Sequence, residues 1–228
     1  MQMIEAIDLA RSILNEPLDA TRSFPDNSSS HWTDTTLMNF YNLIQQEVAA
    51  EINQVYEDYF VTQTFLTIVN GTAEYTLPST FAKMRRVEYM KSNQSHEIVP
   101  VSLNDRGGNY SYVDGSSVFG NSYYLRGNQI VFSDTPTFSD SATVRLQYIR
   151  RLADITAASL TSELPEEHHR VLVWGVVKLC HYAQQANDQM INLASNEFEK
   201  HLKRIREQVE DRQAQRPRKV IQVNGGGY

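Results

Sequence analysis

The sequence lacks several features that would point to a secreted protein or a membrane protein. Its single cysteine, Cys180, cannot form a disulfide within the chain, which suits a protein made in a reducing compartment. No stretch approaches the ~18 consecutive apolar residues of a membrane span. The first residues have neither a positively charged start nor an unbroken apolar run, so we expect no secretion signal. Together these absences predict a soluble protein made in a cytoplasm.

A broad basic surface is also missing. The 228-residue chain carries a net charge of −6, which argues against a nucleic-acid-binding protein whose affinity comes from a basic face. Arg216, Arg218 and Lys219 lie close to the C-terminus, and the rest of the chain holds eighteen basic against twenty-seven acidic residues. A chain of this length buries roughly 70% of the surface that its unfolded form exposes, so it needs no disulfide or metal for a core.

No set of nucleophile, base and acid stands out in the sequence. His168-His169 follows two glutamates, but adjacent helical residues point about 100° apart, so we interpret the pair as a solvent-exposed first helical turn and not as a zinc site. Cys180 is interpreted as a buried structural thiol. Arg106-Gly107-Gly108 lacks the Lys-Ser/Thr of a phosphate-binding loop and is interpreted as a turn. We therefore predict no enzyme, no cofactor and no metal.

Apolar residues at spacings of three and four predict two helices near the N-terminus. The first runs from about Ile4 to Glu16, because Pro17 cannot continue it. The second begins at Thr33 or Asp34, either of which can cap it, and its apolar stripe runs from Leu37 to Tyr59.

Two further helices are predicted near the C-terminus. One begins at Pro165 and is apolar around much of its circumference, so we expect it to be the most buried helix. The other runs from about Gln189 to Gln213. The short connection at Asn187-Asp188 predicts that these two helices form an antiparallel pair.

The middle of the chain has the composition of strands and turns. Residues 62–69 and 73–77 flank Asn70-Gly71, a strong hairpin signal, so we predict that they pair. A second hairpin is predicted around Arg126-Gly127-Asn128. Further strands are predicted at 84–90, 97–103 and 143–149, and residues 104–122 form a long loop. The stretch also contains Tyr110, Tyr112, Tyr123 and Tyr124, which we assign to sheet core and loop packing rather than to a sugar-stacking surface.

The C-terminal tail differs in kind from the rest of the chain. Its basic residues are followed by Val220-Ile221-Gln222-Val223 and then by Asn224-Gly225-Gly226-Gly227-Tyr228. The alternating apolar residues at 220–223 can add as an edge strand to a partner's sheet. Docking on a partner protein is the interpretation we favour, and docking of the tail on its own subunit is the alternative.

These elements predict an α+β fold, in which two N-terminal and two C-terminal helices form a four-helix bundle. An antiparallel β-sandwich or open barrel is inserted between the helix pairs. The predicted parts are residues 1–60 (N-terminal helices), 61–152 (inserted β domain), 153–215 (C-terminal helices) and 216–228 (extended partner-binding tail).

The order of these features resembles the head-to-tail adaptor proteins of tailed bacteriophages. The resemblance rests on Trp32-Thr33-Asp34 with Leu37, Tyr41 and Asn42, then a β insertion, then Leu164-Pro165-Glu166-Glu167 opening the third helix, and a long charged fourth helix before the tail. Among those adaptors the chain is most similar to the tail tubular protein A, or gatekeeper, type. The resemblance covers most of the chain.

What the resemblance implies is a virion structural protein, assembled in the host cytoplasm and located in the neck or tail. It implies a ring, of twelve subunits, beneath the portal protein. That ring would extend the channel through which genomic DNA passes without sequence-specific binding, and it would dock the next neck or tail protein, such as a nozzle or tail tube. The portal contact would be formed by the tail, through Arg216, Arg218, Lys219, Val220, Ile221, Val223 and Tyr228.

Three other functions remain open at this point. The tyrosines and the β insertion fit a carbohydrate- or receptor-binding module of a virion. Within the phage interpretation, a stopper or a tail-completion protein is the alternative neck component. A hydrolase is the most distant alternative, because it needs a catalytic set that we do not find.

Overall fold

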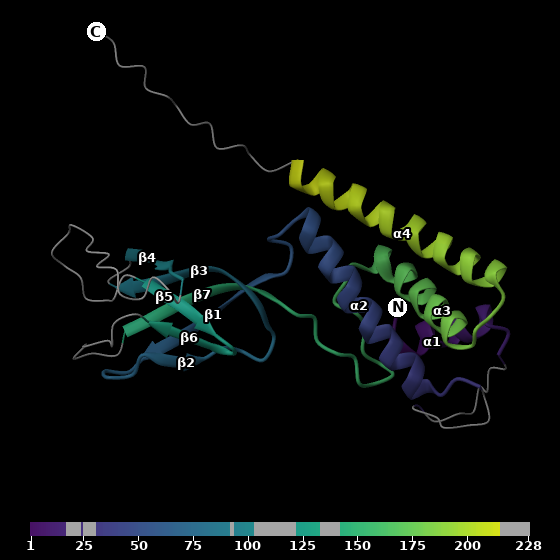
Figure 1. Cartoon of the computed structure of the whole chain (residues 1–228), viewed down its shortest axis with the longest axis horizontal. Coiled ribbons are helices and arrows are strands. Elements are labelled where there is room, and N and C mark those ends of the chain that lie inside the picture. The colour runs from purple at the N-terminus through teal and green to yellow at the C-terminus, as the bar shows by residue number, and fades with distance from the viewer. Residues whose placement is uncertain (17–23, 25–30, 92–93, 103–121, 133–141, 215–228) are drawn as a thin grey trace, which may run out of the picture. The chain divides into compact units, whose positions relative to one another are not determined.

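The computed structural model describes residues 1–16, 24, 31–91, 94–102, 122–132 and 142–214. The chain divides into two compact units. The helical unit comprises the described residues of Met1–Tyr56 and Leu152–Tyr228, and the sheet unit comprises those of Glu57–Arg151. The sheet is thus inserted between two pairs of helices, as the α+β prediction requires (Figure 1).

The N-terminal helices lie close to their predicted positions. Helix α1 spans Met3–Ile13, and α2 spans Asp34–Val55 with Thr33 as its N-cap. The Thr33 hydroxyl accepts a hydrogen bond from the Thr36 amide at 3.1 Å, which satisfies a donor that the helix cannot use internally. The predicted apolar stripe is buried as far as Ile52, but α2 ends at Val55, so Tyr59 lies beyond the helix.

The C-terminal helices confirm the predicted pair and correct its start. Pro165 precedes a short 3-10 helix, η2, at Glu166–His168, and α3 follows at His169–Ala183. The α-helix therefore starts four residues later than predicted. Helix α4 spans Asp188–Ala214 and packs along α3, which also contacts α1 and α2 (Figure 1). The expectation that the third helix is central is confirmed.

Close approach of α2 and α3 depends on a glycine. A Cβ atom added at Gly175 would lie 2.5 Å from Cγ2 of Ile44, closer than carbon atoms approach one another in proteins. Ile44 is fully buried, so it has little room to move. Glycine at position 175 thus sets the distance between these two helices.

The sheet unit contains one curled seven-stranded sheet in the order β1-β7-β3-β4-β5-β6-β2. Of the two predicted arrangements, an open barrel or a β-sandwich, the structure therefore corresponds to the open barrel. All neighbouring pairs are antiparallel except β4 and β5, which are parallel. Its core is formed by eleven buried residues from six strands and the segments beside them. The seven strands of the sheet are β1 (Val61–Ile68), β2 (Glu74–Thr76), β3 (Phe81–Lys91), β4 (Gln94–Pro100), β5 (Ser122–Arg126), β6 (Gln129–Phe132) and β7 (Ala142–Arg150); β2 contributes no residue to the core, but Leu77 beside it does.

One predicted hairpin is wrong and the other is confirmed. β1 and β2 flank Asn70-Gly71, yet β1 pairs with β7 and β2 pairs with β6. Gly71 does adopt a positive φ of 82°, and the Thr72 amide donates to the Val69 carbonyl, so the turn exists without a hairpin. β5 and β6 pair directly across Gly127, whose φ is 58°.

Candidate functional site

The predicted portal-binding residues lie outside the described part of the chain. Helix α4 ends at Ala214, and the predicted tail comprises residues 216–228. Its role therefore stays a prediction. The residues concerned are Arg216, Arg218, Lys219, Val220, Ile221, Val223 and Tyr228.

Among the described residues, the most elaborate polar arrangement lies where α1 ends and α2 begins. α1 ends with Asn15 in the left-handed conformation, at a φ of 56°. The Asn15 amide donates to the Ser12 carbonyl, and the Glu16 amide donates to the Arg11 carbonyl at 2.9 Å. This is the hydrogen-bond pattern of a Schellman motif, with asparagine replacing the usual glycine. The reversal brings Glu16 back beside Arg11.

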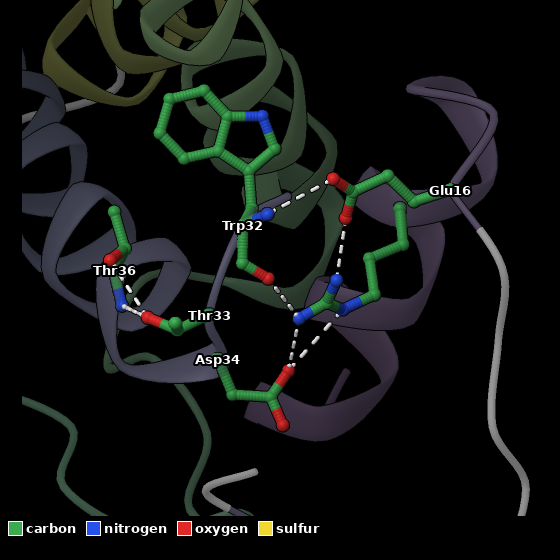
Figure 2. Close-up of polar contacts among 6 residues, drawn as sticks. Glu16, Trp32, Thr33, Asp34 and Thr36 are labelled. Atoms are coloured by element: carbon green, nitrogen blue, oxygen red, sulfur yellow. Dashed lines mark hydrogen bonds and ion pairs between the residues drawn. The ribbon is translucent and has the colours of Figure 1, made fainter. Parts of the chain in front are cut away.

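The Arg11 guanidinium is the centre of a buried cluster, which we call the Arg11 clamp and define as Arg11, Glu16, Trp32 and Asp34. Nη1 donates to Glu16 Oε2 at 2.5 Å, and Nη2 donates to Asp34 Oδ1 at 2.7 Å and to the Trp32 carbonyl at 2.6 Å. The Trp32 amide donates to the other Glu16 oxygen at 3.1 Å (Figure 2). Arg11 is 2% exposed and Asp34 is 0% exposed, so these charges depend on one another.

The three residues Trp32-Thr33-Asp34, singled out in the sequence, have a structural role. Glu16 and Trp32 stand at the two ends of the connection between α1 and α2, and the clamp holds those ends together. Thr33 caps α2, and the Asp34 carboxylate forms an ion pair with the Arg11 guanidinium (Figure 2). All donors and acceptors named here are used in holding the two helices. The arrangement therefore positions the two helices relative to each other.

Buried titratable groups near the helices also have structural roles. Cys180 is 0% exposed, and desolvation raises the pKa of its thiol to about 12, with the nearby Glu16 carboxylate adding to the rise. Such a thiol is unreactive at neutral pH. The prediction of a buried structural cysteine is confirmed.

The interpretation of His168-His169 as an exposed turn is wrong. The two residues are 4% and 5% exposed. His169 Nε2 lies 2.8 Å from the Leu164 carbonyl oxygen, so this ring bonds the segment before η2. Desolvation by burial lowers the pKa of His168. The 3-10 turn at Glu166–His168 directs both rings inward, which the sequence pattern of a straight α-helix does not anticipate. In the described residues, no three His, Cys, Asp or Glu side chains come close enough together to hold a metal ion.

The sheet unit contains an open cleft of about 530 Å³ where the sheet divides. β4 pairs with β3 up to Ile98 and then diverges to pair with β5 at Val99 and Pro100. The walls are largely apolar, with four charged residues among them: Lys83, Arg85, Arg86 and Glu97. Each cation of the wall has a partner. Lys83 bonds Glu57 at 2.6 Å, Arg85 bonds Asp58 at 2.8 Å, and Arg86 bonds Glu97 at 3.4 Å.

Two of the four tyrosines considered in the sequence lie in this unit's interior. Tyr123 and Tyr124 are 5% and 4% exposed, and burial raises the pKa of Tyr123 to about 12. Their assignment to packing within the sheet unit is confirmed, and both residues also line the cleft. Tyr110 and Tyr112 lie outside the described residues.

Several large apolar side chains are exposed, and these are candidates for contacts with other proteins. In the helical unit they are Leu9, Leu43, Leu160, Tyr182, Met190 and Leu193. In the sheet unit they are Val61, Phe65, Val69, Val99 and Leu125. Three of the latter, Val61, Phe65 and Val69, lie along β1 and the residue that follows it.

Comparison with known proteins gives one family. A family model described as SU10 adaptor protein matches residues 1–221, nearly the whole chain. No curated protein matches the chain. Within the part of the chain that the structure describes, no helix is both long and apolar enough to span a membrane.

Proposed function

The chain belongs to the SU10 adaptor protein family, and on that basis we propose that it is a virion structural protein that joins the head of a tailed bacteriophage to its tail. The observation that carries this proposal is the extent of the family match, which begins at residue 1 and ends at residue 221. It includes both helix pairs, the inserted sheet and the first part of the tail. The proposed role is structural and not enzymatic.

In this role the chain forms a ring beneath the portal protein, of twelve subunits. A closed ring needs two different surfaces on each subunit, because one face meets a different face of its neighbour. The exposed apolar side chains are distributed over both units, from Leu9 and Leu43 in the helical unit to Leu125 in the sheet unit. This distribution supports more than one contact surface per subunit.

The C-terminal tail is the proposed contact with the portal. Its basic residues and its apolar segment lie next to one another, and the family match extends through Ile221. A segment that alternates apolar residues can pair with the edge of a partner's sheet, while Arg216, Arg218 and Lys219 bind acidic groups beside that edge. In the sequence, the tail follows helix α4, which runs without interruption from Asp188 to Ala214.

The ring would extend the DNA channel and dock the next neck or tail protein, such as a nozzle or tail tube. Outside the tail the chain carries eighteen basic against twenty-seven acidic residues. Acidic groups facing a channel repel phosphates, so DNA would pass without sequence-specific binding. We further propose that the subunit is of the tail tubular protein A type, assembled in the host cytoplasm and located in the virion neck.

A truncated variant tests the proposal. The full chain and a variant that ends at Ala214 are each mixed with the portal protein of the same virus, and native mass spectrometry measures the complexes. We expect the full chain to give a portal complex with many copies of the chain. The truncated variant should lose portal binding but keep its thermal stability, because the tail adds little to the core.

A charge reversal separates the tail's chemistry from its length. The variant with Arg216→Glu, Arg218→Glu and Lys219→Glu keeps all 228 residues, and we expect it to bind the portal much more weakly at low salt than the unchanged chain. A matched control reverses Lys200, Lys203 and Arg204 on α4, which should leave portal binding intact. Undiminished portal binding by the truncated variant would refute the tail's role, and failure of the full chain to bind the portal would refute the adaptor function.

A further inference from the structure

The two edges of the seven-stranded sheet differ in length and composition. β2, at one edge, has three residues and carries Glu74, which bonds Arg126 at 2.6 Å. β1, at the other edge, has eight residues, Val-Thr-Gln-Thr-Phe-Leu-Thr-Ile, with no charge, no proline and no glycine. Proteins usually shorten or charge an exposed strand edge, because its backbone donors and acceptors recruit other strands. β2 has this protection and β1 does not.

β1 also presents apolar side chains on its solvent-exposed face. Side chains alternate along a strand, and positions 61, 63, 65 and 67 are the exposed ones. Val61 is 36% exposed and Phe65 is 55% exposed, while Val69, just beyond the strand, is 57% exposed. No strand among the described residues pairs with the outer edge of β1. An uncharged edge and two exposed apolar side chains, Val61 and Phe65, therefore coincide on one strand.

The spacing of these residues is symmetric about Phe65. When two copies of a strand pair antiparallel about a two-fold axis through Phe65, each residue faces the one that is equally far from position 65 in the other direction. Phe65 then lies opposite Phe65 of the other copy, Gln63 opposite Thr67, and Val61 opposite Val69. Within β1, Gln63, Phe65 and Thr67 lie on the exposed face, as antiparallel pairing about Phe65 requires. The exposed residues of β1 are thus complementary to themselves.

We propose that β1 pairs antiparallel with β1 of a second copy, in register about Phe65, and that this dimer is the form of the chain outside the virion. A second copy of β1 fits the outer edge of β1 better than the other strands that could pair with it. β2 of a neighbouring copy offers three residues and a charge, and Val220–Val223 of a neighbouring tail covers only half of the edge. A second β1 covers residues 62–68, seven of the eight residues of the edge, and brings no charge. Pairing hides an edge whose composition favours aggregation.

Disulfide trapping tests the register. Opposed residues of an antiparallel pair have Cα atoms about 4.5–5.5 Å apart, within the range that a disulfide spans. We expect Phe65→Cys to form a covalent dimer rapidly under oxidised glutathione. The unchanged chain, with Cys180 buried, should not do so. Val99→Cys, at a 49% exposed position on β4, measures random collisions.

Two mixed variants sharpen this test. Gln63→Cys alone should crosslink poorly, because its symmetric partner position is 67. Mixed with Thr67→Cys, it should give the heterodimer at about tenfold or more the rate of either variant alone. Crosslinking of Phe65→Cys no faster than that of Val99→Cys would overturn the proposal, as would equal crosslinking of Gln63→Cys with itself and with Thr67→Cys.

Charge at the centre of the pair should break the dimer without unfolding the chain. We expect Phe65→Lys to weaken dimerisation about tenfold or more in light scattering, because two ammonium groups then face each other. Leu43→Lys, at a 58% exposed position in α2, is the matched control and should leave the dimer intact. Circular dichroism confirms that both variants are folded. A monomeric unchanged chain at all concentrations would overturn the proposal, and this result would not bear on portal binding, which is measured separately.

Discussion

The helical unit and the sheet unit handle their polar groups in opposite ways. In the helical unit, the ends of α1 and α2 are closed by a Schellman motif, an N-cap and the buried Arg11 clamp. In the sheet unit, β4 leaves β3 to open a cleft, and the uncharged edge of β1 has no described partner. Ion pairs there lie mostly near the surface, with Glu88, beneath Arg86 and Arg145, as the buried exception.

The difference shows how one chain can combine rigidity with assembly. In the helical unit, the polar groups that join α1 and α2 are paired with one another, so a partner adds no hydrogen bonds to them. A unit with an open strand edge gains hydrogen bonds when a strand is added to it. We infer that the sheet unit provides strand edges for contacts with other proteins. The variants below test this contrast, and both tryptophans, Trp32 and Trp174, lie in the helical unit and report on it alone.

The largest effect is expected from Arg11→Met. Removing the guanidinium leaves the Asp34 and Glu16 carboxylates buried without a cation, which costs about 3–5 kcal/mol of unfolding free energy. Urea unfolding followed by tryptophan fluorescence measures it. Arg212→Met is the control, because Arg212 and Glu167 form an ion pair with both side chains about half exposed, and it should cost less than about 1 kcal/mol. Equal losses in the two variants would show that the clamp does not hold the helices.

Gly175→Ala should have the next largest effect. The added methyl group would overlap Ile44, and we expect a loss of about 1–3 kcal/mol despite the better helix propensity of alanine. The double variant with Ile44→Ala tests the cause, because it restores the space. If the cost of Gly175→Ala is the same with and without the Ile44 side chain, contact between α2 and α3 does not explain it.

Thr33→Ala should cost about 1 kcal/mol. The substitution removes the hydroxyl that caps α2, so the Thr36 amide loses its acceptor. Thr35→Ala, at an exposed position of the same turn, should have little effect. Comparing the urea midpoints of the two variants checks the prediction, and a more harmful Thr35→Ala would contradict it.

The smallest effect is expected from pH. Burial lowers the pKa of His168, His181 and His201, all in the helical unit. The unfolded state therefore binds protons at a higher pH than the folded state. The contribution of these neutral histidines to the free energy of unfolding is fully present above the ordinary histidine pKa of about 6.5. It decreases as the pH drops below that value. We expect a lower urea midpoint at about pH 5.5 than at about pH 7.5. His181→Gln with His201→Gln should reduce that difference, and an unchanged difference would contradict the assignment to these two rings.

Much of the fold could be predicted because helix periodicity is a local signal. The stripe through Phe198, Leu202 and Ile205 is buried as expected, and the β5–β6 hairpin forms across its predicted turn. The hairpin predicted at Asn70-Gly71 does not form. There, β1 pairs instead with β7, which lies far away in the sequence, and such long-range pairing leaves no local trace.

The Arg11 clamp could not be predicted for a similar reason. Arg11 reads as an ordinary polar residue on a helix, and its partner Asp34 reads as a capping residue of the next helix. Asn15, two residues before Pro17, was the available signal, since asparagine often ends helices in the left-handed conformation. This signal indicates a chain reversal, but it does not indicate which carboxylate is brought beside Arg11. The burial of His168 and His169 depends likewise on a 3-10 turn that the sequence pattern does not show.

Electron microscopy of the chain mixed with its portal protein tests the adaptor function most directly. The account predicts a symmetric ring of this chain against one end of the portal, with the density of residues 216–228 continuing from α4 into the portal. A mixture in which portal particles carry no added ring, while the chain stays separate as monomers or dimers, would contradict it.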